Sequence, residues 1–156
     1  MEDITPYRAA LQDPLLKKRL AAARSLGKSG NPSAVRPLVE ALSDPHPNVR
    51  REAALAVARL DDDEAVPGLI DALRDPELEV RVAALAALGR LKDRRAAEPV
   101  CQCLTDCEEI IRIGAAEVLG RLGDRRAIEP LRQLAQDPFS DVRESAELAI
   151  TRLAKK

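Results

Sequence analysis

Residues 80–91 read VRVAALAALGRL, and the same pattern returns along the chain at a fixed interval. It reads VRREAALAVARL at 49–60, IRIGAAEVLGRL at 111–122 and VRESAELAITRL at 142–153, and a weaker copy, KRLAAARSLGKS, occupies 18–29. The spacing is 31 residues throughout, without an insertion. Self-similarity at a period of this length indicates a protein built from stacked helical repeats.

Length and composition narrow the classes of protein that fit. The 156 residues hold five copies of the 31-residue unit, and we expect a single domain over 1–156 with repeats at about 2–30, 31–61, 62–92, 93–123 and 124–156. A formal net charge of −1 gives no general attraction to nucleic acid or to an anionic membrane. No apolar run approaches the roughly 18 residues of a membrane span, and the start Met-Glu-Asp does not resemble a leader. We therefore expect a cytoplasmic protein without a membrane partner.

An apolar seam predicts the second helix of each repeat. In the second copy Val49, Ala53, Val57 and Leu60 follow one another at the spacing of a single buried helix face, which predicts a helix of about 12 residues. Alanine occupies the position of Ala53 in all five copies. Such an alanine indicates that neighbouring helices approach closely, because a larger side chain would push them apart.

The first helix of each repeat is predicted over segments such as 31–44 and 124–137. Each begins with a residue whose side-chain oxygen suits an N-cap, namely Asn31, Asp62, Asp93 and Asp124. Proline recurs five or six residues further on, at Pro6, Pro37, Pro99 and Pro130. Proline inside a helix removes a hydrogen bond and costs about 3 kcal/mol, so we expect a recurring bend.

Two charged positions recur around the turn between the two helices. They are Asp13, Asp44, Asp75, Asp106 and Asp137 and, six residues later, Arg19, Arg50, Arg81, Arg112 and Arg143. Together with the recurring proline and the phrase LGRLGDRRAIEPL at 119–131, these positions resemble the HEAT-like repeats of the phycobilisome-lyase type over the whole chain. Two departures are Gly68, with Pro67 one position early, and Cys107 in place of the turn proline.

The resemblance implies that the two charged rows tie successive repeats together, through Asp44, Asp75, Asp106 and Asp137 with Arg50, Arg81, Arg112 and Arg143. We expect an all-α fold, a right-handed α-solenoid of five HEAT-like helix pairs. Its first helices would form the outer face and its second helices the concave inner face.

Candidate chemical sites are few. Cys101 and Cys103 are two residues apart, about 200° around a helix, so they cannot direct both thiolates at one ion. The better interpretation of both cysteines is that they are small apolar side chains buried in the core. The single histidine, His46, lies between prolines in a turn, and no serine or threonine has a histidine partner. We expect no catalytic residue, no metal ligand and no cofactor.

Arginines near one edge are the more promising feature. Arg59, Arg90, Arg121 and Arg152 form a row at the end of the second helices, and Arg94, Arg95, Arg125 and Arg126 follow in the next turns. Intervening acidic residues and missing aromatic residues argue against a nucleic-acid surface and allow a merely solvated edge.

We predict a non-catalytic protein-interaction module. Its partner, another protein with an acidic rim, would rest on Val82, Arg90, Ile113 and Arg121 of the concave face. Alternatively, Val82 and Ile113 are tucked between adjacent second helices and only support packing.

Two other functions stay open. The family resemblance allows a subunit or accessory factor that attaches phycobilin to phycobiliproteins or detaches it. The uninterrupted period also allows a designed or consensus-derived repeat scaffold, which irregular residues such as Cys101, Cys103 and Phe139 oppose.

Overall fold

The computed structural model describes residues 3–155, and every regular element in this range is helical. The chain forms two compact units, the first ending at Leu91 and the second beginning at Lys92. Between residues 3 and 155 no helix has both the length and the apolar character that crossing a membrane would require.

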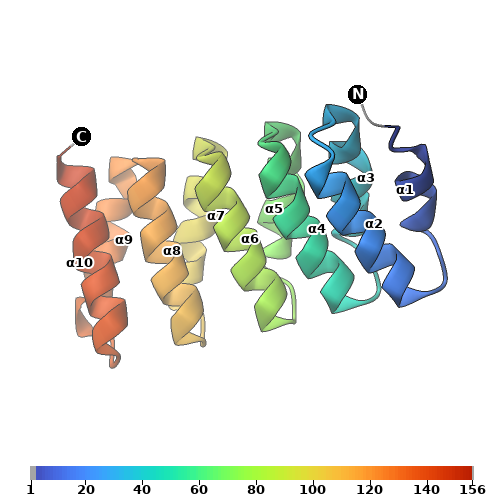
Figure 1. Ribbon diagram of the computed structural model, residues 1–156. Coiled ribbons are helices and arrows are strands. Elements are labelled where there is room, and N and C mark those ends of the chain that lie inside the picture. Colours follow the sequence, from blue (N-terminus) through green and yellow to red (C-terminus); the bar gives the residue numbers. More distant parts are fainter. Residues whose placement is uncertain (1–2, 156) are drawn as a thin grey trace. The chain divides into compact units, whose positions relative to one another are not determined.

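The first unit contains three antiparallel helix pairs. The first-position helices are α1 (Thr5–Ala10), α3 (Val35–Ala41) and α5 (Val66–Ala72), and the second-position helices are α2 (Leu16–Lys28), α4 (Pro47–Leu60) and α6 (Leu78–Leu91). Short 3-10 turns, η1 (Pro32–Ala34) and η2 (Asp63–Ala65), precede α3 and α5. Figure 1 shows α2, α4 and α6 side by side in one layer, with the first-position helices behind them.

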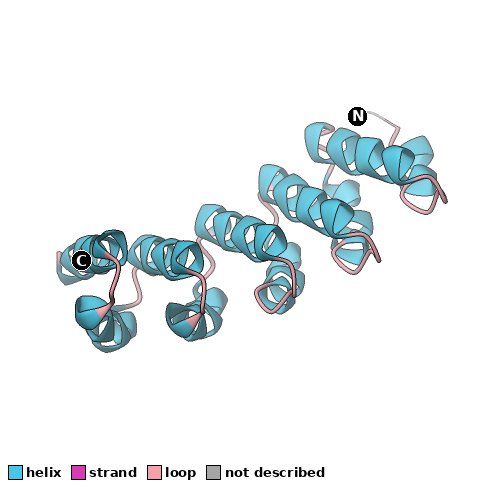
Figure 2. Ribbon diagram, turned by 90° about the horizontal axis from the view of Figure 1, so that it is seen from below, coloured by secondary structure: helices cyan, strands magenta, loops and turns pink. Residues whose placement is uncertain are grey.

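The second unit contains two pairs built in the same way. Its helices are α7 (Ala97–Gln102), α8 (Glu109–Leu122), α9 (Ile128–Arg132) and α10 (Ser140–Ala154), and its 3-10 turns are η3 (Arg94–Ala96), η4 (Cys103–Thr105), η5 (Arg125–Ala127) and η6 (Gln133–Gln136). Seen along the helices in Figure 2, each unit has one layer of first-position helices and one of second-position helices.

Small residues set the distance between second-position helices, as the recurring alanine predicted. Ala53 is fully buried in α4. A Cβ added to Gly27 of α2 would lie only 2.7 Å from the Cβ of Ala56 in α4. In the second unit a Cβ on Gly120 of α8 would lie 3.1 Å from the Cα of Ala149 in α10. The helices therefore pack almost backbone to backbone at these points.

The recurring prolines lie in the first turns of the α-helices. The expectation that they fall in the interior of a helix is therefore wrong. A 3-10 turn takes up the residues after the cap, and the α-helix starts only at Val35, Ala97 or Ile128. Pro37 is consequently the third residue of α3. Amides in the first turn have no acceptor within the helix, so proline there removes no hydrogen bond.

The predicted N-caps are confirmed. Each of the four side chains accepts a hydrogen bond from the backbone N–H two residues later, at 3.0 Å for Asn31, 2.9 Å for Asp62, 2.8 Å for Asp93 and 3.0 Å for Asp124. These caps start the 3-10 turns rather than the α-helices themselves. The turn between repeats is therefore fixed by local hydrogen bonding.

Candidate protein-interaction site

Arginine–aspartate pairs join successive repeats within the first unit. The guanidinium of Arg19 in α2 donates from Nε and Nη2 to the carboxylate of Asp44, at 2.8 and 3.2 Å. Arg50 in α4 makes the same bidentate pair with Asp75, at 2.7 and 2.9 Å. Burial would raise the pKa of Asp75, but the hydrogen bonds from Arg50 and from the Glu77 N–H outweigh it and lower that pKa.

The second unit repeats this arrangement with Arg112 of α8 and Asp137. Nε and Nη2 of Arg112 lie 2.7 and 3.1 Å from the carboxylate oxygens of Asp137, and this side-chain hydrogen bond lowers the pKa of Asp137. The arginine also lies over the ring of Phe139, 5.7 Å from its centroid. The third nitrogen, Nη1, donates to the backbone oxygens of Asp106 and Cys107.

These pairs fit the role that the family resemblance implied, and they define its direction. Each links the arginine of one repeat to the aspartate of the next, 25 residues further on. Arg19, the partner of Asp44, therefore belongs to the ladder, although the implied arginines began at Arg50. Paired and partly buried charges of this kind contribute more than exposed ion pairs do.

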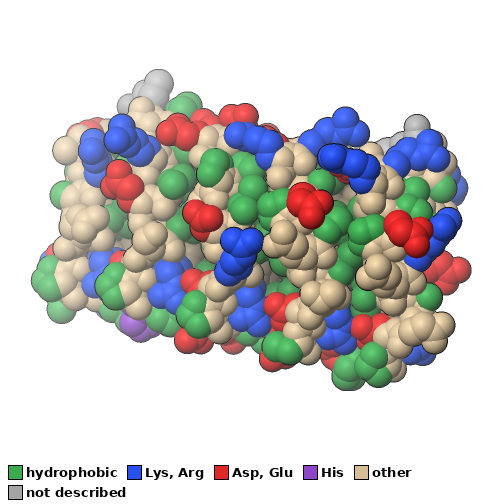
Figure 3. All heavy atoms as spheres, turned by 180° about the vertical axis from the view of Figure 1, so that it is seen from behind, with side chains coloured by type: hydrophobic (Ala, Val, Ile, Leu, Met, Phe, Trp, Pro, Cys, Tyr) green, Lys and Arg blue, Asp and Glu red, His purple; other side chains and the backbone are tan. Residues whose placement is uncertain are grey.

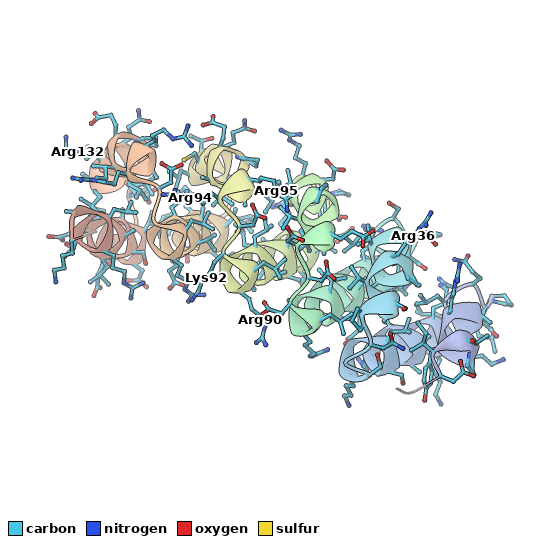
Figure 4. The ribbon with its side chains drawn as sticks, turned by 90° about the horizontal axis from the view of Figure 1, so that it is seen from above. Arg36, Arg90, Lys92, Arg94, Arg95 and Arg132 are labelled. Atoms are coloured by element: carbon cyan, nitrogen blue, oxygen red, sulfur yellow. The ribbon has the colours of Figure 1, made fainter. Side chains whose placement is uncertain are left out.

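The second-position helices carry the predicted partner-binding residues. We call their solvent-facing side the second-helix face. In the first unit Val82 of α6 is 38% exposed, and Ala86 and Arg90 are exposed one and two turns further along. Arg90 makes no ion pair with any residue in the described range, and its side chain projects away from the ribbon in Figure 4.

A buried carboxylate changes the charge of this face. Glu52 of α4 is 6% exposed and lies 3.1 Å from Arg24 Nε and 3.9 Å from Arg59 Nη1. Arg59 is therefore partly neutralised, whereas Arg90 is not. The sequence pattern did not indicate this cluster, because the other copies have no acid at the position of Glu52.

In the second unit Ile113 of α8 is half-buried and Arg121 is exposed. The guanidinium of Arg121 lies 3.7 Å from Glu117, itself exposed, one turn earlier. Three more apolar side chains lie open on this unit: Ile110 is 47% exposed, Phe139 48% and Leu148 52%. Ile110 is not among the predicted residues; its place next to the buried Ile111, outside the seam, was the available signal.

Arg95 and Arg126, two of the four arginines in the turns that follow the second-position helices, form ion pairs with nearby aspartates. Arg95 in η3 and Arg126 in η5 fold back onto the capping aspartates, with shortest contacts of 2.7 Å to Asp93 and 2.6 Å to Asp124. The side-chain hydrogen bond from Arg126 and a backbone bond from the same residue lower the pKa of Asp124 to about 2. In Figure 4 Arg94 and Arg95 lie on either side of the ribbon at this edge. A solvated edge explains Arg95 and Arg126.

The three cysteines differ in their surroundings. Cys103 is buried with its Sγ 3.6 Å from the Pro99 oxygen, Cys107 is exposed, and Cys101 is half-buried. Burial raises the pKa of the Cys101 thiol. Within residues 3–155 no three side chains of His, Cys, Asp or Glu are grouped so that they could hold a metal ion.

Solved structures share this architecture. One is the complex of CpcE and CpcF of phycocyanin lyase from Nostoc, with 30% identity and a TM-score of 0.85 over all of this chain and 66% of that one. An engineered protein has 23% identity and a TM-score of 0.70, covering 99% and 80% of the two chains. A designed armadillo repeat protein in complex with a (KR)4 peptide has 19% identity and a TM-score of 0.70, covering 96% and 81%.

The last two likenesses, below 25% identity, show the fold alone. The chain spans slightly less than two thirds of the phycocyanin lyase chain that it matches. A comparison with curated proteins finds no significant match. The sequence profile of HEAT repeats matches residues 4–77 and 66–151. The predicted all-α repeat fold is thereby confirmed, and the chain belongs to the family of HEAT repeat proteins.

Proposed function

We propose that this chain is a non-catalytic protein-interaction module of the cytoplasm, whose partner rests on the second-helix face. The observation that carries the proposal is Val82, an exposed apolar side chain on the same side of α6 as Arg90, which forms no ion pair within residues 3–155. Apolar anchors next to arginine are typical of the energetic centres of protein interfaces.

The residues have distinct roles in this proposal. Val82 and Ile113 supply apolar contact, each on its own unit. Arg90 and Arg121 meet carboxylates of the partner, which therefore has an acidic rim. Arg121 is available because an exposed pair at 3.7 Å is weak. Leu148, 52% exposed on α10, extends the apolar contact in the second unit.

The opposite side of each unit is a less suitable surface. Figure 3 shows acidic, basic and apolar side chains interspersed over the first-position helices. On α3, for example, the exposed Arg36 lies 3.8 Å from the exposed Glu40. The similarity to a chain from the complex of CpcE and CpcF supports a binding role, because that structure contains two associated proteins.

A matched pair of charge reversals tests the proposed face. Once a partner has been identified by affinity capture and purified, we expect Arg90→Glu and Val82→Asp each to weaken its binding about tenfold in calorimetry. Arg36→Glu on α3 is the control, since it makes the same charge change on the other side. The assignment is wrong if Arg36→Glu weakens binding as much as Arg90→Glu does, or if neither second-helix variant has an effect.

A second candidate function rests on the 30% identity to the phycocyanin lyase structure. In that case the chain is a subunit or accessory factor that attaches a bilin to a phycobiliprotein or detaches it. Incubation with bilin and apo-phycobiliprotein, followed by denaturation and absorbance of the separated polypeptide, measures the covalent product. The alternative is rejected if the product yield is the same with and without the chain.

A further inference from the structure

Arg143 of α10 has one occupied edge and one open edge. Its Nη1 donates to the backbone oxygens of Asp137 and Pro138, at 2.6 and 3.1 Å, as the other ladder arginines do in their own turns. In Arg112 the Nε and Nη2 edge holds an aspartate of the next repeat. No carboxylate within residues 3–155 meets that edge of Arg143, whose side chain is exposed. The guanidinium is thus held in place by Nη1, and its Nε and Nη2 donors, which we call its fork, are free to bind a carboxylate.

A groove lies beside this free fork. It has a volume of about 750 Å³ and is lined by Leu131, Arg132, Ala135, Arg143, Ala146, Glu147, Ile150 and Thr151. Its apolar part is unusually open, because Ala135 occupies the position at which earlier repeats have leucine, as at Leu104. Ile150 is half-buried, whereas its counterpart Leu119 is fully buried. The groove therefore offers apolar surface next to a fixed cation.

The rim of the groove is not shaped for another helix packed as α10 packs on α8. Thr151 occupies the position of Gly120, where even a Cβ would lie 3.1 Å from Ala149. Glu147 occupies the position of the fully buried Ala116. A branched side chain and a charge at these positions keep a neighbouring helix further away. A narrower element, such as a turn or an extended segment, still reaches Arg143 and Ile150.

We propose that this groove, the Arg143 groove, binds a segment of another protein that carries one carboxylate next to an apolar side chain. The carboxylate pairs with Nε and Nη2 of Arg143, and the apolar side chain covers Leu131 and Ile150. Glu147 on the rim disfavours a second carboxylate. The groove shares no residue with the proposed partner-binding set of Val82, Arg90, Ile113 and Arg121, so it does not depend on the function proposed above.

The chain's own turns supply a probe for this site. The synthetic peptide ALSDPHPNV, residues 41–49 with an amidated C-terminus, carries one carboxylate in its sequence, that of Asp44, which is the group that the Arg19 guanidinium binds. Leu42 supplies the apolar side chain. Its turn is held locally, since Asp44 accepts a hydrogen bond from the His46 N–H at 2.8 Å. Binding of the fluorescein-labelled peptide to the full chain is followed by fluorescence anisotropy.

We expect saturable binding below about 2 mM peptide and about tenfold weaker binding when the peptide carries Asn in place of Asp44. Arg143→Lys keeps the charge but loses the fork, and should weaken binding about tenfold. Ala135→Leu restores the leucine of the other repeats, fills the groove and should have a similar effect. Arg125→Ala, an exposed arginine in η5 outside the groove, is the matched control.

Three results of the anisotropy experiment would overturn the proposal. They are no saturable binding of the peptide, equal binding of the Asn peptide, and a loss of affinity for Arg125→Ala as large as that for Arg143→Lys. Because Arg143 also holds its own turn, circular dichroism checks the fold of each variant. Ala135→Leu provides an independent test, since Ala135 is exposed and its replacement breaks no hydrogen bond. Wild-type affinity for this variant would equally overturn the proposal.

Discussion

Arg19, Arg50 and Arg112 each use their guanidinium twice, once within their own repeat and once towards the next. Arg50 donates from Nη1 to the oxygens of Asp44 and Pro45 and from its other edge to Asp75. Only a planar group with several fixed donors can do both, so lysine would not replace it. The side chains of Arg50 and Asp75 are 14% and 9% exposed, which limits screening by solvent.

Removing one ladder carboxylate should therefore be costly. We expect Asp75→Asn to lower the free energy of unfolding by about 2 kcal/mol at pH 7, because a hydrogen bond to a charged group contributes roughly that much. Because the pKa of Asp75 is lowered by folding from the ordinary value of 3.8, its contribution is present above that pH and is lost as the pH falls through the folded value. Urea unfolding at pH 7 and pH 3 measures both statements.

Asp71→Asn is the matched control for this experiment, because Asp71 is an exposed carboxylate in α5 of the same unit. We expect it to change the free energy of unfolding by less than about 0.5 kcal/mol. If Asp71→Asn and Asp75→Asn destabilise the chain equally, the ladder contributes no more than surface charge.

At the scale of elements, the distance between second-position helices rests on small residues. Ala53 is fully buried in α4, which packs against α2 and α6 within the first unit. We expect Ala53→Leu to destabilise the chain by about 1 to 3 kcal/mol through overpacking. Ala146→Leu should cost much less, because Ala146 lines the open Arg143 groove and the larger side chain can extend into it. Equal urea midpoints for the two variants would contradict this difference.

The elements could be predicted only in part. The seam of Val49, Ala53 and Val57 predicted the second helix, and residues such as Asp93 predicted the caps. The division of the first helix into a 3-10 turn and an α-helix was missed, because both conformations accept the same small residues and the same capping side chain. Pro37 was the available signal, since proline is well tolerated only near a helix start.

At the scale of the whole molecule, the period of 31 residues predicted the fold, whereas most contacts of the candidate site could be seen only in the three-dimensional structure. Helix phase alone placed Val82 and Arg90 at the surface. It could not show that Glu52 neutralises Arg59 or that Arg143 lies beside a groove. Glu52 and Arg59 lie on the same helix, and the groove is lined by residues of the last repeat alone. Both features depend on how individual side chains are placed and packed, which the repeat pattern does not specify.

The two compact units should differ in whether they fold when each is expressed alone. A fragment of residues 1–91 contains three helix pairs, and one of residues 92–156 contains two. Repeat arrays need about three stacked units for stability. We therefore expect the first fragment to show helical circular dichroism and cooperative thermal unfolding, and the second to be largely unfolded at 25 °C. A sharper thermal transition for residues 92–156 than for residues 1–91 would contradict this expectation.

The pairs Arg19–Asp44, Arg50–Asp75 and Arg112–Asp137 each join residues 25 positions apart, which has a consequence for the kinetics of folding. The chain needs to close only short loops to make its strongest polar contacts, so the entropic barrier to each closure is small. Low contact order is associated with folding in microseconds to milliseconds. Once one helix pair and its neighbour have formed, each further pair adds to an existing template. Such a chain can fold from its first repeats while the later ones are still being synthesised.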